Sequence, residues 1–439
     1  MSTCTECFQA LGCFDYNAAN KISNKIIRIN AIGSILVTIT KCEQSYTSFE
    51  YLKTNKFFRK DDYLNTEVIN LINILIKSTP PINPNHNEDH IDPDYLMRLC
   101  RDLKNFIKIR QEQISIYRAI STHFSNFNSD YIIDEIEAYK EKAENFKLVE
   151  NLGPLGIGVE RELTILRYLF IAQKAITAYD FKNSTIFLYN AKSYLSSWKE
   201  ICSQQVYSEK SSKIEEPTSA FAFSALYNVF SDKLTKNGKR TNESPNNMQW
   251  IENFLCNLTS KMTLYFMNIL LERENVIGGD IKSLWKDTTI NYHKEIKDLL
   301  RQTGANHIAL IYEVTEDIPF HEDGYGYGGT KYKTPEGKNS FPFIYSFPKE
   351  KPEQHQPNII SIIQNNKRLS PFTISAPSHF YDNKVGRDYY YIRIDDHVWL
   401  IIIFSEKHSI PNNALESIMS LSRRLSGVEI LNSLQKFSE

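Results

Sequence analysis

The chain has 439 residues, which is longer than one hydrophobic core usually serves, so the sequence predicts two or three domains. Its formal net charge is −1, so no long-range field attracts a phosphate backbone, and we expect no nucleic-acid partner. The longest strongly apolar stretch, Val398 to Phe404, is too short to cross a bilayer, which predicts no direct membrane insertion. Seven cysteines without an export signal at the N-terminus predict reduced thiols and a cytoplasmic location.

Amphipathic helices are predicted for most of the first 286 residues, because apolar side chains there recur at steps of three and four. One stripe runs from Ile165 to Tyr179 and a second from Leu188 to Cys202, so these two helices should form an antiparallel hairpin. The β-branched-rich segment from Ile26 to Tyr51 predicts one long helix. We therefore expect residues 1–286 to form an antiparallel helical bundle. Polar segments predict its loops at 78–94, 208–218 and 235–247.

The pattern changes near residue 291, from where the chain predicts the order α-β-β-α-β-β-β-α. The first of these helices should end at Gly304, and the segment Val398 to Phe404 is apolar on both faces, which is typical of a covered central strand. We therefore expect residues 287–439 to form an α+β domain with a mainly antiparallel sheet, and the fold class of the whole chain to be α + α/β. The strands are expected at 308–312, 341–347, 373–381, 389–394 and 398–404.

A glycine-rich loop is the strongest formal match to a ligand-binding motif, because Gly324, Gly326 and Gly329 satisfy G-x-G-x-x-G. A phosphate-binding loop of this kind must open a helix, and the following segment, residues 331–337, contains Pro335 and cannot begin one cleanly. A surface loop between two strands is the interpretation that we adopt. The alternative is a nucleotide-binding module or an enzyme that uses the loop at 324–329.

Other candidate catalytic or metal-binding groups are also incomplete. Cys4 and Cys7 have the spacing of half a zinc site, but no second pair follows, so we interpret them as packing residues. His379, Asp382 and the turn at 395–397 contain acid–base residue types, yet polar residues at strand ends have conformational reasons to occur there. We therefore predict no enzyme activity, no cofactor and no metal.

The block His379-Phe-Tyr-Asp-Asn-Lys-Val385 is the most specific of several segments that match one known family. Through these segments the sequence resembles the small KICSTOR-subunit family along nearly its whole length. The chain departs from the family in its richness in Asn, Ile and Lys and in the loop after His321, which keeps only the Gly-Tyr character. The other matching segments are 357–363, 398–407, 10–16, 57–61, Ala172-Gln173, 179–181 and Trp198.

The resemblance implies a helical bundle followed by a roadblock-like domain, and a scaffold role without catalytic residues. The implied partners are the other KICSTOR subunits, namely a large scaffold subunit, kaptin and an FG-GAP propeller-type subunit. The complex would be recruited to the lysosomal surface, hold the GATOR subcomplex with GAP activity there, and restrain mTOR complex 1 on amino-acid or glucose deprivation. Self-association is left open.

The family block supplies the candidate interface residues, and the competing interpretation is that the block only forms a turn of the fold. A second alternative for the whole protein is a roadblock-type regulator of a small GTPase that acts alone. The candidate interface residues are His379, Phe380, Tyr381, Asp382, Lys384 and Val385.

Overall fold

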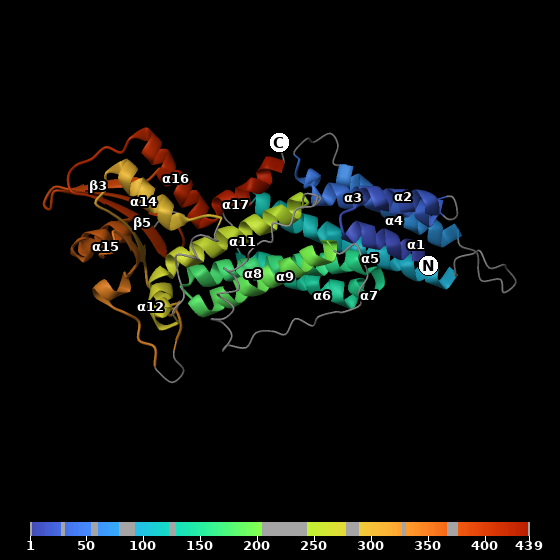
Figure 1. The fold of residues 1–439 in the computed structure, drawn as a ribbon, viewed down its shortest axis with the longest axis horizontal. Helices are drawn as coiled ribbons and strands as arrows, with labels where there is room; N and C mark the ends of the chain where they lie inside the picture. Colours follow the sequence, from blue (N-terminus) through green and yellow to red (C-terminus); the bar gives the residue numbers. More distant parts are fainter. Residues whose placement is uncertain are drawn as a thin grey trace.

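Helices run along most of the length of the elongated protein, and a sheet forms one end (Figure 1). The predicted domain boundary between residues 286 and 287 lies outside the described residues, as do the predicted loop at 208–218 and most of those at 78–94 and 235–247. The computed structural model describes residues 2–27, 31–53, 60–78, 93–122, 129–203, 244–277, 289–326, 331–366 and 376–437.

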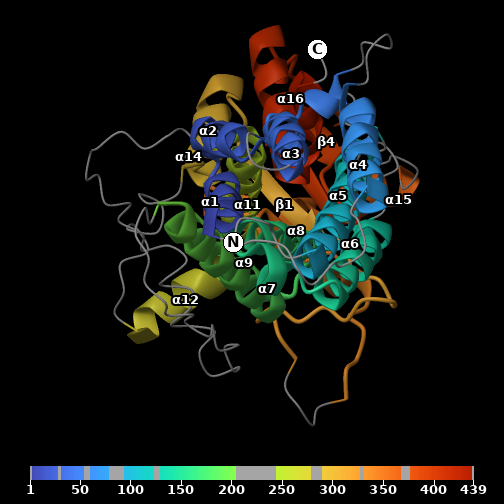
Figure 2. The same ribbon diagram turned by 90° about the vertical axis from the view of Figure 1, so that its right-hand side faces the viewer.

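The helical part is organised around α8, which contacts α1, α5, α6, α7, α9 and α11 and lies in the middle of the helices when they are viewed end-on (Figure 2). Its buried residues occupy most of the circumference of the helix, and Glu160, Arg167 and Lys174, which are partly or fully exposed, lie on one narrow side. The helices before the sheet are α1 (Ser2–Gly12), α2 (Tyr16–Ile27), α3 (Ile32–Thr47), α4 (Lys60–Ser78), α5 (Pro93–Thr122), α6 (Ser129–Asn145), α7 (Leu148–Leu152), α8 (Pro154–Thr177), α9 (Phe181–Ser203), α11 (Asn246–Tyr265) and α12 (Met267–Ile277).

The predicted pair of neighbouring helices is present as α8 and α9, which share the most extensive helix contact in the protein's described part. The chain leaves α8 through Tyr179, whose φ of 55° is left-handed. Asp180 then caps the start of α9, because its Oδ1 accepts the Asn183 backbone N–H at 3.0 Å. The short joint is therefore built from one left-handed residue and one side-chain cap.

The prediction of one helix from Ile26 to Tyr51 is wrong. Helix α2 ends at Ile27, α3 spans Ile32–Thr47, and a 3₁₀ turn follows at Glu50–Leu52. Helices α2 and α3 pack on each other, and Gly33 permits their close approach, since a Cβ there would lie 2.3 Å from the Ile27 nitrogen. Apolar periodicity continues across the break because both helices bury β-branched residues.

The sheet has the strand order β2-β1-β5-β4-β3 with antiparallel neighbours. Its elements follow the predicted order, with short shifts of the strand ends. Residues 367–375, which include most of the predicted start of β3, lie outside the description. The elements are α14 (Tyr292–Thr303), β1 (His307–Tyr312), β2 (Phe343–Phe347), α15 (Gln356–Asn365), β3 (Ser378–Asp382), β4 (Arg387–Arg393), β5 (Val398–Phe404), α16 (Asn412–Ser426), α17 (Val428–Asn432) and the 3₁₀ helix η6 (Ser433–Phe437).

Strand β5 lies in the middle of the sheet, and all seven of its side chains are buried, as its apolar sequence predicts. Trp399, Ile401 and Ile403, which point to one face, share a core with α15. Leu400 and its alternate neighbours belong instead to the large core that includes α14, α16 and the helices before the sheet. One face of the sheet thus packs on α15, and the other joins the core of the helical part.

The segment after α16 returns along the helices of the first half of the chain (Figure 1). The Trp250 indole N–H on α11 donates to the Ile430 carbonyl at 2.9 Å. Further along, the Gln435 side chain donates to the Ser121 carbonyl at 3.0 Å, and the Phe437 ring lies 5.1 Å from that of Phe49. Residues 430–437 therefore pack against α5, α11 and Phe49.

Candidate interface at the edge of the sheet

The family block lies on the β3–β4 hairpin, where β3 is an edge strand. Asp382 shapes the turn, because its Oδ1 accepts the backbone N–H of Lys384 at 2.8 Å and that of Val385 at 3.3 Å. Gly386 completes it with a φ of 64°, a conformation that favours glycine. Asp382 and Gly386 thus have a conformational role, as the competing interpretation of the block requires.

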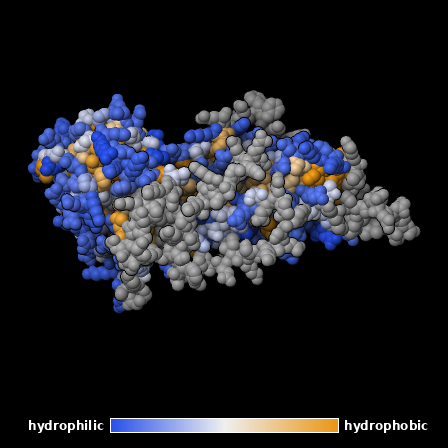
Figure 3. Space-filling model, viewed as in Figure 1, coloured by the Kyte–Doolittle hydropathy of each residue, from blue (hydrophilic) through white to orange (hydrophobic). Residues whose placement is uncertain are grey.

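Two apolar side chains of the hairpin have no such role. Phe380 is 43% exposed and Val385 is 52% exposed, which is unusual for large apolar residues in the described part of the chain. Lys384 is also exposed, while Tyr381 is half-buried. The sheet end of the molecule is otherwise mainly hydrophilic on the face seen in Figure 3, with apolar side chains in small separate areas. Phe380 and Val385 are therefore the best candidates for contact with another protein.

His379 has a structural partner that the sequence did not reveal. Its Nε2 lies 2.5 Å from Oδ1 of Asp388, a fully buried carboxylate on β4. The second oxygen of Asp388 accepts the His408 backbone N–H at 2.8 Å, so the carboxylate joins the hairpin to the loop after β5. The pairing follows from the β3–β4 register, which places His379 opposite Tyr390 and diagonal to Asp388.

The acid–base residues considered from the sequence are not brought together. His379 lies opposite Tyr390 in the middle of β4, whereas Asp395 lies beyond the C-terminal end of that strand. Asp382 accepts the Asn358 side-chain amide at 3.0 Å. The described residues therefore separate His379 from the turn at 395–397.

Asp395 instead forms a buried ion pair with α11. The Lys261 ammonium lies 2.8 Å from the carboxylate, and the Tyr265 hydroxyl donates to the same group. Lys261 is 1% and Asp395 6% exposed. Burial, followed by the neighbouring Asp395 charge, raises the pKa of Tyr265 well above its usual value, so this hydroxyl stays protonated and can donate. The contact fixes the β4–β5 turn to the helical part.

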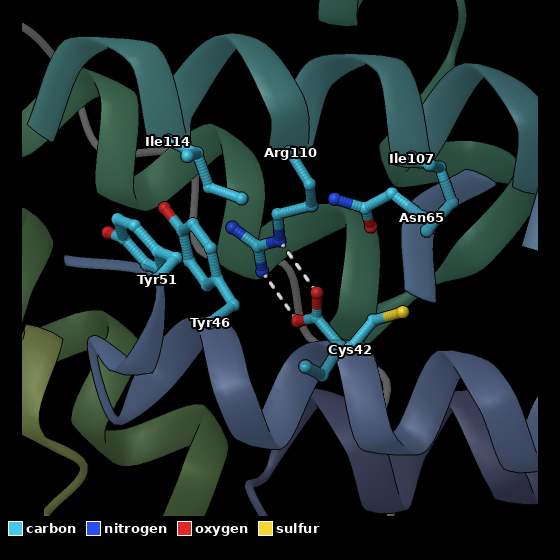
Figure 4. Close-up of a pocket in the computed structure, with 8 residues that line it drawn as sticks. Cys42, Tyr46, Tyr51, Asn65, Ile107, Arg110 and Ile114 are labelled. Carbon is cyan, nitrogen blue, oxygen red and sulfur yellow. Dashed lines mark hydrogen bonds and ion pairs between the residues drawn. The ribbon is translucent and has the colours of Figure 1, made fainter. Parts of the chain in front are cut away.

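A second buried ionic group lies inside the helical part and centres on Arg110 of α5 (Figure 4). The guanidinium forms a bidentate ion pair with Glu43 of α3: its Nε donates to Oε1 at 2.9 Å and its Nη2 donates to Oε2 at 2.8 Å. Its Nη1 lies 3.0 Å from Oε2 of Glu162 on α8, and the Tyr46 ring packs against it at 4.2 Å.

Neighbouring groups complete the hydrogen bonding of Glu162. Its Oε1 accepts from the Tyr117 hydroxyl at 2.7 Å and from the Asn247 amide at 3.1 Å, so the group connects α3, α5, α8 and α11. Burial raises the pKa of Glu43, with Arg110 opposing that change. A cavity of about 10 Å³ beside Arg110 admits one water molecule at most. This is the packing of a structural network and leaves no room for a substrate.

The described part of the glycine-rich loop packs on the N-terminus of α9. The Gly324 carbonyl accepts the Phe181 backbone N–H at 2.9 Å, which satisfies one free donor of that helix. A Cβ on Gly324 would lie 2.4 Å from the Phe181 Cβ, and its φ is 73°. Residues 327–330 lie outside the description, and no α-helix begins in 331–336. The observed contact gives Gly324 a packing role.

Replacing Gly324 with alanine is expected to lower the free energy of unfolding by about 2–4 kcal/mol, from left-handed backbone strain and from overpacking against Phe181. Gly304→Ala is the matched control, because Gly304 also has a positive φ but no atom would lie within 4 Å of an added Cβ. Its expected cost is about 1–2 kcal/mol. Urea unfolding followed by circular dichroism measures both, and equal losses would contradict the packing role of Gly324.

Cys4 and Cys7, which have the spacing of half a zinc site, are packing residues in the described structure. Cys4 and Cys7 are buried in the hydrophobic core, and the Cys7 thiol lies 3.3 Å from the Ser23 hydroxyl. Within the described ranges, no three His, Cys, Asp or Glu side chains are grouped so that they could hold a metal ion. Among the helices that the structure describes, none is both long enough and apolar enough to cross a membrane.

Comparison with known proteins finds similarity over almost the whole chain. A family model described as "KICSTOR complex C12orf66 like" matches residues 5–436. KICSTOR subunit 2 of Xenopus laevis is 25% identical, in an alignment that covers 98% of this chain and 96% of that protein. KICSTOR subunit 2 of Danio rerio is 23% identical, over 86% of this chain and 81% of that protein.

Proposed function

We propose, because this chain belongs to the KICSTOR C12orf66-like family, that it is a non-enzymatic scaffold subunit of a KICSTOR-like complex. In this role it helps to recruit the GATOR subcomplex with GAP activity to the lysosomal surface and negatively regulates mTOR complex 1 on amino-acid or glucose deprivation. Its direct partners are the large scaffold subunit, kaptin and the FG-GAP propeller-type subunit. The observation that carries the proposal is the family match over residues 5–436, which includes both the helices and the sheet.

We further interpret residues 287–439 as a roadblock-like domain and residues 1–286 as the helical bundle that precedes it. The support is the element order α-β-β-α-β-β-β-α and the antiparallel strand order β2-β1-β5-β4-β3. A fold by itself does not determine a function, so the scaffold role rests on the family and not on this interpretation.

The proposed contact surface is the β3–β4 hairpin with His379, Phe380, Tyr381, Asp382, Lys384 and Val385. Exposed apolar side chains in a hydrophilic surrounding favour burial against a partner. The two exposed large apolar side chains among them are Phe380 and Val385, and neither is needed to hold the turn, which Asp382 and Gly386 form. Binding energy at such a surface is expected to concentrate on these two side chains.

The double substitution Phe380→Ser with Val385→Ser is expected to reduce recovery of the other subunits at least tenfold when the tagged protein is isolated from its own cells. Truncating an interface anchor typically costs about 1–2 kcal/mol or more, and two such losses exceed a factor of ten in affinity. Quantitative mass spectrometry of the isolated complex measures the effect in nutrient-poor and nutrient-rich cells.

The matched control is Tyr131→Ser with Val149→Ser, because these side chains of the helical part are 56% and 42% exposed. The control should leave recovery unchanged. If the wild-type protein recovers none of the subunits under either condition, the scaffold role is wrong. If the wild type recovers them and both double variants do so equally, only the hairpin surface is wrong.

A further inference from the structure

Two partly exposed thiols lie where the C-terminal ends of α1 and α9 meet. Cys13 directly follows α1, and Cys202 belongs to the last turn of α9. The Cys13 Sγ lies 3.6 Å from the Ile201 carbonyl oxygen, and the Cys202 Sγ lies 3.5 Å from the Gly12 carbonyl oxygen. Each thiol therefore contacts the residue that precedes the other cysteine.

This reciprocal arrangement has a local cause. The last carbonyls of a helix have no partner within the helix and accept hydrogen bonds from outside it. Here each helix end supplies a carbonyl to the thiol of the other, and the rings of Phe14 and Trp198, 5.9 Å apart, pack the two ends together. The contacts with the carbonyls and the packing of the two rings together hold the thiols in place.

The contacts bring the two cysteines within reach of a covalent bond. A carbonyl oxygen is close to the Cα of the next residue, so each sulfur lies within about 6.5 Å of the Cα of the other cysteine. To form the bond, both side chains must rotate from these carbonyls toward each other, and the two helix ends must hold the Cα atoms at the roughly 4.4–6.8 Å that a disulfide requires. The pair is also accessible, whereas Cys4, Cys7, Cys42 and Cys100 are buried.

We propose that Cys13 and Cys202 are an oxidative modification site that forms a disulfide on exposure to a peroxide. The Cys13 sulfur attacks one peroxide oxygen, the O–O bond breaks, and a sulfenic acid and one water result. The Cys202 sulfur then attacks the Cys13 sulfur and displaces the hydroxyl group as a second water. Two thiols and one hydrogen peroxide thus give one disulfide and two waters, with the peroxide reduced by two electrons.

The surroundings of the thiols make this a slow reaction. Burial, followed by the charge of Asp15, raises the pKa of Cys13. Burial, followed by the proximity of Cys13, raises the pKa of Cys202 to about 12. Since the thiolate is the reacting form, disulfide formation should quicken about tenfold per pH unit between pH 7 and pH 8.5. The site responds to sustained oxidation and not to a brief pulse.

The test is oxidation of the purified full-length chain with hydrogen peroxide, followed by denaturation in acid and counting of thiols. The reduced protein has seven thiols, and the oxidised protein is expected to have five. Peptide mapping should then recover one cross-linked pair that contains Cys13 and Cys202, and dithiothreitol should restore the missing thiols. The rate measured from pH 7 to pH 8.5 should rise as stated.

Cys13→Ser and Cys202→Ser should each abolish the cross-link and still fold, because serine can donate to the same carbonyl. Circular dichroism and thermal unfolding under reducing conditions check the fold of each variant. Cys256→Ser, which replaces another partly buried cysteine, should keep the cross-link. The proposal is overturned if the oxidised wild type keeps all seven thiols, if it stops at a sulfinic acid on Cys13, or if the cross-link joins other cysteines.

Discussion

Replacing Arg110 with methionine is expected to lower the free energy of unfolding by about 3–5 kcal/mol, the typical cost of removing one partner of a buried ion pair. Methionine fills a similar volume, so the loss is electrostatic. The substitution removes the guanidinium that donates to both carboxylate oxygens of Glu43, and it leaves the carboxylate of Glu162 with hydrogen bonds but without a cation. Urea unfolding followed by circular dichroism gives the size of the loss.

The pH dependence of this variant distinguishes an electrostatic loss from a packing loss. Burial already raises the pKa of Glu43, and removing Arg110 removes the charge that opposes this rise. When the pKa of a carboxyl group is higher in the folded state than its unfolded value of about 4.3, the protein loses stability as the pH rises through the folded-state pKa. The loss of stability should therefore be smaller at pH 5 than at pH 8.

The control variant is Arg101→Met, on the exposed side of α5, which should change stability by less than about 0.5 kcal/mol. If the loss in Arg110→Met did not depend on pH, an electrostatic origin would be contradicted.

Lys261→Met is expected to cost about 3–5 kcal/mol as well, because Asp395 would remain buried with only the Tyr265 hydroxyl as a charge-stabilising partner among the contacts described. The β4–β5 turn should then detach from α11 more easily than the rest of the sheet. Amide hydrogen exchange followed by mass spectrometry measures this, with faster exchange expected at residues 394–398.

The control for this prediction is an exposed ion pair with a similar distance between its charged atoms. The Lys199 ammonium lies 2.7 Å from Glu252, but the two side chains are 32% and 37% exposed. Lys199→Met should cost less than about 1 kcal/mol, since exposed pairs contribute little. Adding Asp395→Asn to Lys261→Met should recover part of the loss, because the uncompensated charge is removed. Equal effects of Lys199→Met and Lys261→Met would show that burial of the pair is unimportant.

The sequence predicts those elements whose signal is local. The pair α8 and α9 has two clean apolar stripes and a short joint, and β5 has an apolar run with the length of a strand. Gly304 ends α14 with a φ of 68°, as its position predicts. These features need no knowledge of distant parts of the chain.

The elements missed from the sequence depend on long-range packing. The helices α2 and α3 are separate and pack closely where Gly33 meets the Ile27 backbone, and periodicity alone cannot distinguish two packed helices from one. Arg110, Glu162 and Lys261 read as ordinary charged positions on helices, and their burial follows from partners 52 to 134 residues away. For the candidate interface, the block at 379–385 was correctly placed at a strand end, whereas its partner Asp388 required the register of β3 and β4.

The path of residues 430–437 has a consequence for biosynthesis. The contacts of Gln435 with Ser121 and of Phe437 with Phe49 join segments that leave the ribosome more than 300 residues apart. At a typical synthesis rate of about 5–20 residues per second, the N-terminal helices spend on the order of tens of seconds without these neighbours. During that time the apolar surface around Phe49 is open to chaperones, and a nascent chain that stalls before residue 430 presents that surface to cellular quality control.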